Sequence, residues 1–146
     1  MEAISKVFEI TDEGDICDFL GVNTQWLPDG KCHLAQPRLI TSIIADVGLK
    51  DESNSVNTPA ASAAPLGADE GGALFNGPWH YRSVIGKLNH LAKSTRPDIA
   101  FAVHQCARFS ASPRESHGKA VKRIARYLMS TPDPVSYTHL TLPTIA

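Results

Sequence analysis

Three amphipathic helical patterns follow one another closely in the second half of the chain, and they limit its fold more than any other feature. They span residues 79–93, about 95–109 and about 112–129. The second opens on Thr95-Arg-Pro-Asp and the third on Ser112-Pro-Arg-Glu. Each opening supplies a capping hydroxyl, a proline suited to the first turn and a carboxylate, and the third has the spacing of a capping box. Each pattern has an apolar face, so the sequence predicts a bundle of three helices.

The third pattern has two chemically different sides. At 100° per residue, one side collects the apolar residues Val121, Ile124, Ala125 and Leu128. The other side collects four cations at positions i, i+3, i+4 and i+7, namely Lys119, Lys122, Arg123 and Arg126. Four more cations precede them on the earlier patterns, namely Arg82, Lys87, Lys93 and Arg96. Such a cationic side suits contact with a phosphate backbone. It would recognise the charge and shape of the nucleic acid and not the sequence of its bases. A solvated helix face is the alternative, because many surface helices are rich in Lys and Arg.

The charge of the chain is divided between its two halves. The total is nearly balanced, with 14 basic and 15 acidic side chains and a net charge of −1. Residues 1–75 nevertheless carry a net charge of −8, whereas residues 76–146 carry +7. The basic half predicts a polyanionic partner for the three helical patterns.

The first half combines a hairpin and a helix. Residues 19–26 alternate between apolar and polar side chains, as a strand with one buried face does. The Leu-Pro-Asp-Gly sequence at 27–30 then predicts a tight turn into a second strand over 31–35. Gln36-Pro37 opens a helix whose apolar stripe ends at Gly48. With a helix end predicted at residues 3–8, these elements and the bundle indicate an α+β fold.

Composition divides the chain into four parts. Residues 1–49 hold the hairpin and its helix, and residues 79–131 hold the three helical patterns. Between them, residues 50–78 are rich in Pro, Gly, Ala and Ser, which is typical of a flexible linker. Residues 132–146 are set aside as a non-native tail, because the sequence from about residue 134 resembles an in-frame translation of a sequencing adapter.

The sequence offers no recognisable catalytic centre or metal site. Its adjacent acidic pairs fall in predicted turns or in the linker, its histidines lack ligand spacing, and no Gly-x-Ser-x-Gly motif or phosphate-binding glycine loop occurs. Three cysteines without Cys-x-x-Cys spacing indicate a reducing compartment. We find no signal peptide and no membrane-spanning run. We therefore expect an intracellular protein, cytoplasmic or nuclear, without membrane contact.

Several motifs taken together point to a family. The most specific are Tyr-Arg-Ser-Val-Ile-Gly-Lys-Leu at 81–88 and Thr-Arg-Pro-Asp-Ile-Ala-Phe-Ala-Val at 95–103. Asp-Phe-Leu-Gly at 18–21 and Lys-Arg-Ile-Ala-Arg-Tyr-Leu at 122–128 support them. In this order and spacing they resemble the C-terminal part of copia-type retrotransposon reverse transcriptases over about residues 1–131. The resemblance implies a palm-to-thumb fragment of a right-hand RNA-directed DNA polymerase within a Pol polyprotein.

The resemblance also implies what this chain lacks. The family's polymerase uses Mg²⁺ at paired aspartates on a Tyr-x-Asp-Asp hairpin, and this sequence has no such motif. We therefore expect no catalytic residue, metal or cofactor in the chain, and no polymerase activity from the chain alone. Its expected partners are the rest of the polymerase, the ribonuclease H module that follows it in such polyproteins, and an RNA/DNA template–primer duplex.

The resemblance assigns roles to two sets of residues. The hairpin resembles a primer grip, with the candidate residues Phe19, Leu20, Gly21 and Trp26. Packing within the hairpin is the stronger interpretation of the two aromatic rings. The eight cations named above are the candidates for nucleic-acid contact on thumb- and connection-like helices, although an ion pair at a helix start is our first interpretation of Arg96. Two other hypotheses stay open, namely an autonomous helical nucleic-acid-binding module and a decayed element fragment without a function.

Overall fold

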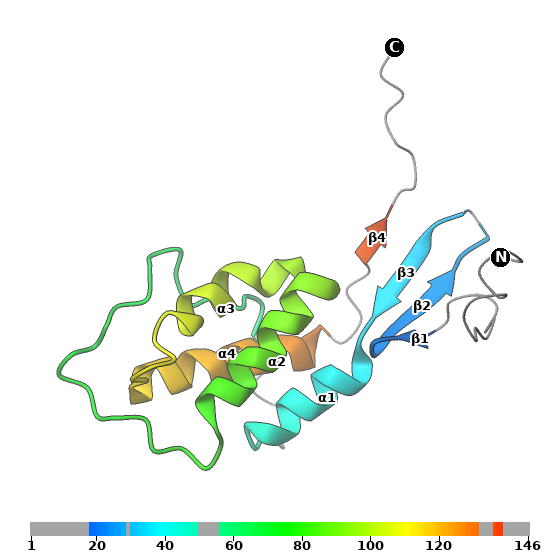
Figure 1. Ribbon diagram of the computed structural model, residues 1–146. Helices are drawn as coiled ribbons and strands as arrows, with labels where there is room; N and C mark the ends of the chain where they lie inside the picture. The colour runs from blue at the N-terminus through cyan, green and yellow to red at the C-terminus, as the bar shows by residue number, and fades with distance from the viewer. Residues whose placement is uncertain (1–17, 29, 50–55, 132–135, 139–146) are drawn as a thin grey trace, which may run out of the picture.

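The computed structural model describes residues 18–28, 30–49, 56–131 and 136–138 (Figure 1). Within these residues, four α-helices form one body and a small antiparallel sheet lies at one end of it. The strands are β1 (Asp18–Phe19), β2 (Val22–Trp26), β3 (Cys32–Ala35) and β4 (Ser136–Thr138). The helices are α1 (Pro37–Asp46), α2 (Tyr81–Ser94), α3 (Ala100–Ala107) and α4 (Glu115–Ser130), with a short 3₁₀ helix (Pro97–Ile99) before α3. The predicted α+β fold is confirmed, while the helix end predicted at residues 3–8 lies outside the described residues.

The predicted hairpin is formed by β2 and β3. The two strands pair in antiparallel register, with Trp26 opposite Cys32. The Gly30 N–H donates to the Leu27 carbonyl (3.0 Å), and the Leu27 N–H donates to the Lys31 carbonyl (2.8 Å). Gly30 has a φ of +79°, in the left-handed region that glycine adopts without a steric penalty. The Leu-Pro-Asp-Gly sequence therefore makes the turn that we predicted from it.

Two further strands extend this hairpin. β1 pairs with β2 through a two-residue turn in which Leu20 and Gly21 both have positive φ, 51° and 76°. Turns of this type match the twist of antiparallel strands, but the left-handed conformation is unfavourable for a side chain as large as Leu. β4 pairs with β3 and comes from the tail that we set aside. β2 occupies only one edge of β3. The backbone groups of the other edge can pair with almost any extended segment, which explains the pairing with β4.

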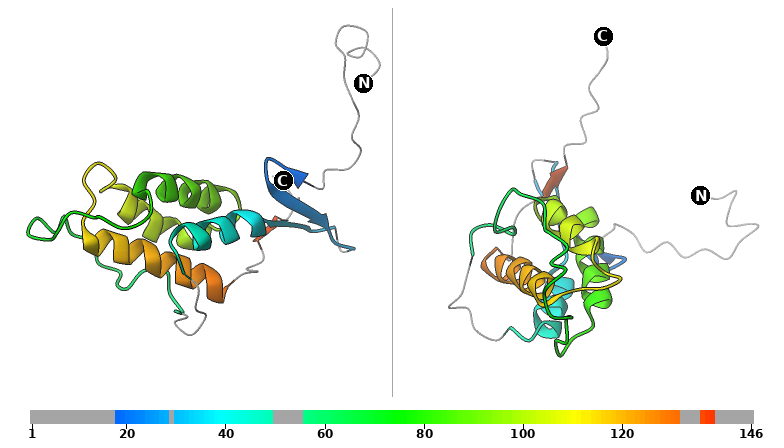
Figure 2. Two further views of the ribbon diagram at one scale, coloured as in Figure 1. Left: turned by 90° about the horizontal axis from the view of Figure 1, so that it is seen from below. Right: turned by 90° about the vertical axis from the view of Figure 1, so that its left-hand side faces the viewer.

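α1 shares one core with the three later helices. Contacts join α1 to α2, α2 to α3, α3 to α4, and α4 back to α1, so the four helices form a closed ring. α2 and α4 therefore lie on opposite sides of the bundle, as the end-on view in Figure 2 shows. Ile40, Ile43 and Val47, at the start and end of the α1 stripe, are buried in the cluster that also holds the apolar residues of α2, α3 and α4. This arrangement differs from the predicted division, which placed α1 with the hairpin in a separate part of the chain.

The described part of the predicted linker packs onto the bundle. Hydrogen bonds join it to α4 in reverse order, Val56 to Ser130, Thr58 to Arg123, and Gly67 to His117. Residues 56–67, which we call the strap, therefore run antiparallel along α4. Further on, the chain loops around the end of the bundle that lies away from the sheet (Figures 1 and 2). The Phe75 ring then packs against Trp79, with ring centroids 4.5 Å apart. Composition predicts a flexible linker here. It cannot reveal these contacts, because they are made with residues far away in the sequence.

The start of α3 differs from the prediction. Thr95 follows the last residue of α2 and does not cap the next helix. Its hydroxyl instead donates to Oε1 of Gln36, which is also buried (3.0 Å). The next helical segment begins as a 3₁₀ turn at Pro97 and continues as α3 from Ala100.

The start of α4 also uses different residues from those predicted. The Arg114 N–H donates to Nδ1 of His117 (2.9 Å), so His117 takes the place that the predicted capping box gave to Glu115. The Glu115 carboxylate instead accepts a hydrogen bond from the Asn76 N–H (3.1 Å). In the described part of the chain, no helix combines the length and the apolar character needed to cross a membrane.

Candidate nucleic-acid interface

α4 turns its predicted apolar side toward the core. Val121, Ile124, Ala125 and Leu128 are all buried, as the helical pattern predicted. Because an α-helix turns by 100° per residue, the four cations of α4 then point away from the core. A buried side chain holds each end of this helix, His117 at the N-terminal end and Arg96 at the C-terminal end.

The N-terminal end of α4 is held by His117, which is buried. Its Nδ1 accepts the hydrogen bond from Arg114, so Nε2 carries the ring proton and donates to the Gly67 carbonyl (2.9 Å). The imidazole also stacks on Phe109, with ring centroids 4.2 Å apart. His117 thereby joins α4 to the end of the strap. Sequence reasoning treated His117 as an isolated histidine, and its position three residues after Arg114 is the signal that was missed.

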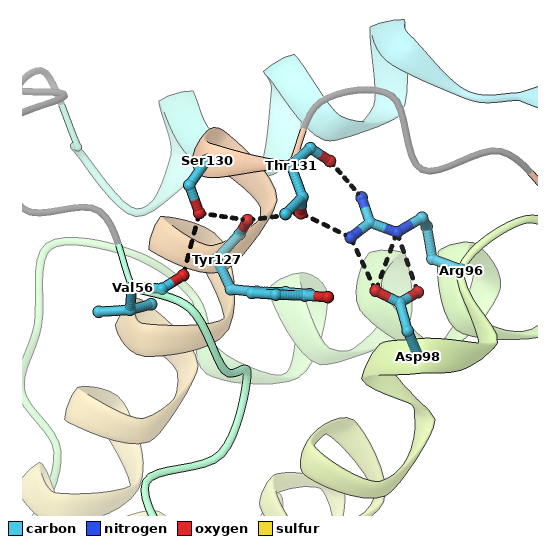
Figure 3. Close-up of polar contacts among 6 residues, drawn as sticks. All are labelled: Val56, Arg96, Asp98, Tyr127, Ser130 and Thr131. Atoms are coloured by element: carbon cyan, nitrogen blue, oxygen red, sulfur yellow. Dashed lines mark hydrogen bonds and ion pairs between the residues drawn. The ribbon is translucent and has the colours of Figure 1, made fainter.

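The C-terminal end of α4 is held by Arg96 (Figure 3). Its guanidinium donates to the carbonyl and the hydroxyl oxygen of Thr131, both at 2.8 Å, and to the carboxylate of Asp98. Only 2% of Arg96 is exposed, and each of its three side-chain nitrogens has a partner. Its assignment as a nucleic-acid contact is therefore wrong. The ion pair at the helix start, our first interpretation of this residue, is present with Asp98 (2.8 Å).

Asp98 stays ionised because of this network. Burial raises the pKa of its carboxyl, but hydrogen bonds from Arg96 and Tyr127 and the charge of Arg96 outweigh that effect, so the pKa lies below its ordinary value. The carboxylate consequently balances the guanidinium charge. The pair contributes no net charge to the surface beside α4.

The four cations of α4 form a positive stripe along its outer side. Lys119 is exposed, and Lys122, Arg123 and Arg126 are partly exposed. The Arg123 guanidinium donates to the carbonyl and the hydroxyl of Thr58 in the strap (3.2 and 2.9 Å). Lys119, Lys122 and Arg126 form no hydrogen bond or ion pair with any residue that the structure describes. We call these four residues the α4 stripe.

The cations predicted on α2 do not join this stripe. Arg82 and Lys93 are exposed on α2, on the opposite side of the bundle from α4. Lys87 forms an ion pair with Asp46 of α1 (2.7 Å) and donates to Ser42 (2.8 Å). The structure therefore separates the eight predicted cations into the α4 stripe, a second group on α2, and the buried Arg96.

A pocket of about 480 Å³ lies between the strap, α3 and α4. We call it the strap pocket. Three residues of the α4 stripe line it, namely Lys119, Arg123 and Arg126. Phe101 of α3 forms part of its wall and is 49% exposed. Sequence reasoning missed this pocket, although Phe101 gives a signal, since it is a large apolar residue outside the buried side of α3.

Comparison with known proteins places the chain in a family. It is 36% identical, over 91% of its length, to the retrovirus-related Pol polyprotein from transposon RE1 of Arabidopsis thaliana. It is 32% identical, over 88% of its length, to the Pol polyprotein from transposon TNT 1-94 of Nicotiana tabacum. The chain belongs to the retrotransposon Pol polyproteins. This Pol segment is also 29% identical, over 89% of its length, to a putative transposon Ty5-1 protein of Saccharomyces cerevisiae, of which it covers 42%.

The Pol segment corresponds to a small portion of these relatives. It covers 9% of the RE1 polyprotein and 10% of the TNT 1-94 polyprotein. No protein-family model matches it, and no solved structure matches it. The sequences of the relatives therefore carry the family assignment.

The primer-grip candidates of the Pol segment lie in the sheet, at the two ends of β2. Leu20 and Gly21 form the turn before β2, and 77% of Leu20 is exposed. Trp26 is the last residue of β2 and is 52% exposed. At about 3.3 Å per residue, β2 places Trp26 roughly 13 Å from Val22, the residue that follows the turn. The side chain of Phe19 lies outside the described part of the structure.

The described residues of the Pol segment do not provide a resident metal centre. They contain no group of three or more His, Cys, Asp or Glu side chains close enough to hold an ion. They therefore do not fit the Mg²⁺ site of the polymerase that the resemblance implies, and we assign no metal-dependent step to them. Cys106 is buried, and burial raises the pKa of its thiol to about 11.

Proposed function

We propose that this Pol segment contributes template–primer binding to the RNA-directed DNA polymerase of a copia-type retrotransposon. The α4 stripe is the surface that would contact the duplex. In this role the segment holds the nucleic acid through its phosphates, and the catalytic residues belong to other parts of the polyprotein.

The observation that carries this proposal is the unpaired positive charge of the α4 stripe. Three of its four cations have no partner among the described residues, and the helix that bears them is fixed at one end by His117 and at the other by Arg96. A row of cations on a helix that is held at both ends suits a phosphate backbone, because little backbone freedom remains to be lost on binding. Membership of the Pol family makes nucleic acid the relevant polyanion.

The salt dependence of binding tests this proposal. We expect the full chain to bind an RNA/DNA hybrid duplex in a fluorescence anisotropy titration. If the four cations each neutralise one phosphate, the slope of log K against log salt should be about −3.6. Lys122→Gln combined with Arg126→Gln removes two contacts and should reduce the slope to about half of that value.

A matched double variant controls for net charge. Arg38→Gln on α1 combined with Arg108→Gln after α3 removes the same charge from exposed positions outside the stripe. This control should keep the slope of the unmodified chain. An affinity that does not change with salt, or an equal loss in both double variants, would contradict a duplex contact at the α4 stripe.

A further inference from the structure

The strap pocket has the size and lining of a binding site for one part of a larger ligand. Its volume of about 480 Å³ falls within the usual range of about 300–1,000 Å³ for small-molecule sites. Apolar side chains form much of the lining, among them Leu66 of the strap, Ala102 of α3, and Ala120 and Ile124 of α4. A double helix is far too wide for this space, whereas a single base is not.

The charged residues of the pocket lining are all basic, so the pocket favours a negatively charged ligand. Lys119, Arg123 and Arg126 all reach the pocket from α4, and none of the described residues that line it is acidic. At 1.5 Å of rise per residue, these cations are spaced by about 6 and about 4.5 Å along the helix axis. They therefore form a row rather than a single point of charge, which suits a ligand with more than one negative group in sequence.

One other lining residue indicates what the rest of the ligand is. Phe101 presents a half-exposed aromatic ring to the pocket. Bases stack on such aromatic rings in sites for single-stranded nucleic acid. A flat ring attached to successive phosphates is the chemistry of a nucleotide strand.

We propose that the strap pocket holds unpaired nucleotides of a single strand that extends from the bound duplex. Where the strand leaves the duplex, its phosphates take the place of duplex phosphates on Lys119, Arg123 and Arg126, and one base stacks on Phe101. A cationic groove with an aromatic platform is the usual arrangement of sites for single-stranded nucleic acid. This inference rests on the proposed function, because the same stripe leads from the duplex surface into the pocket.

The test compares two ligands on the full chain. One is a blunt DNA duplex, and the other is the same duplex with a single-stranded oligo-dT extension, both labelled with fluorescein. We expect the extended duplex to bind at least about fivefold more tightly, because stacking of one base on an aromatic side chain has an effect of this size. Phe101→Ala should remove this gain and leave the affinity for the blunt duplex unchanged.

Two further variants separate stacking from general effects. Phe101→Trp keeps an aromatic platform and should keep the gain. Leu74→Ala truncates another exposed apolar residue, 62% exposed and outside the pocket lining, and should also keep it. Equal binding of the two duplexes by the unmodified chain would overturn the pocket proposal and leave duplex binding intact. Binding of neither ligand would instead contradict the proposed function.

Competition identifies the chemistry that the pocket recognises. Free oligo-dT should displace the extended duplex at far lower concentration than inorganic pyrophosphate does, because pyrophosphate supplies negative charge without a base. If both compete equally at equal charge, the pocket is an anion site without a base platform, and the proposal is wrong.

Discussion

Arg96 links the end of α2, the start of the next helical segment and the end of α4, and so helps to fix the position of α4. It follows α2, pairs with Asp98 at the start of the next helical segment, and donates to Thr131 at the end of α4. Thr131 in turn donates to the Tyr127 carbonyl in the last turn of that helix (2.7 Å). A single guanidinium therefore connects three elements, and a lysine could not reproduce its planar set of donors.

Loss of Arg96 should destabilise the whole chain. Arg96→Met leaves the Thr131 carbonyl and the Asp98 carboxylate without their donor, and we expect the free energy of unfolding to fall by about 2–4 kcal/mol. Arg38→Met, at an exposed position of α1, should change it by less than about 0.5 kcal/mol. Urea denaturation followed by circular dichroism measures both. Equal unfolding midpoints for the two variants would show that Arg96 does not hold the bundle together.

Asp98 should give the stability a dependence on pH. The pKa of this carboxyl is lower in the folded chain than its ordinary value, so the ionised form favours folding. This contribution is fully present above the ordinary pKa of about 4 and is lost as the pH falls through the folded pKa, because the carboxyl is then protonated in both states. Urea titrations at a series of acidic pH values should show a smaller loss of stability for Asp98→Asn than for the unmodified chain. Parallel pH profiles would contradict this.

Leu20 is a residue whose replacement should stabilise the chain. Its φ of +51° in a two-residue turn is unfavourable for Leu and acceptable for Asn, and Asn-Gly is the preferred sequence of such turns. We expect Leu20→Asn to raise the free energy of unfolding by about 0.5–1 kcal/mol. Leu74→Asn, at another exposed leucine without positive φ, should not raise it. Thermal denaturation of the two variants measures the difference.

At the scale of elements, local sequence patterns predict whether a segment forms a helix, a strand or a turn. They do not predict which distant residues its side chains will contact. The Leu-Pro-Asp-Gly turn and the two sides of α4 follow from neighbouring residues, and both are found as predicted. The partner of Thr95 is Gln36, and the partner of Arg123 is Thr58. These pairs are more than fifty residues apart, so no local pattern reveals them. The strap, and with it the strap pocket, was missed for the same reason.

α1 is an example within the hydrophobic core, because its packing partners also lie far away in the sequence. Its packing on the later helices can be tested by substitution. Ile43 is fully buried in the same cluster as Trp79, whose ring reports on the helical bundle. Ile43→Ala should lower the stability by about 2–4 kcal/mol, as truncation of a buried side chain does. In a Trp26→Phe background, the fluorescence of Trp79 should follow this loss in a single transition, whereas Thr41→Ala on the exposed side of α1 should have little effect. An unchanged Trp79 transition in Ile43→Ala would restore the predicted division between α1 and the later helices.

At the scale of the whole molecule, the positive charge of the second half is not one surface. The sequence places ten basic residues after residue 75 and predicts one polyanion for them. In the folded chain, α2 and α4 occupy opposite sides of the four-helix ring. Charges on the far side act on a bound duplex only across the protein, and salt screens exposed charges beyond about 10 Å at 0.1 M. The net charge therefore predicts only a class of partner, and the ring of helices limits which cations a single partner could contact.

This geometry predicts unequal effects of two substitutions with equal charge. Arg82→Gln with Lys93→Gln removes two cations from α2, and Lys122→Gln with Arg126→Gln removes two from α4. One straight duplex cannot touch both sides of the bundle, so the α4 pair should weaken duplex binding by about tenfold or more at moderate salt, and the α2 pair by less than about twofold. Anisotropy titrations at equal ionic strength compare them, with circular dichroism as a check on folding. Similar losses in the two variants would mean that the duplex meets both sides, and that the α4 stripe is not the surface that binds it.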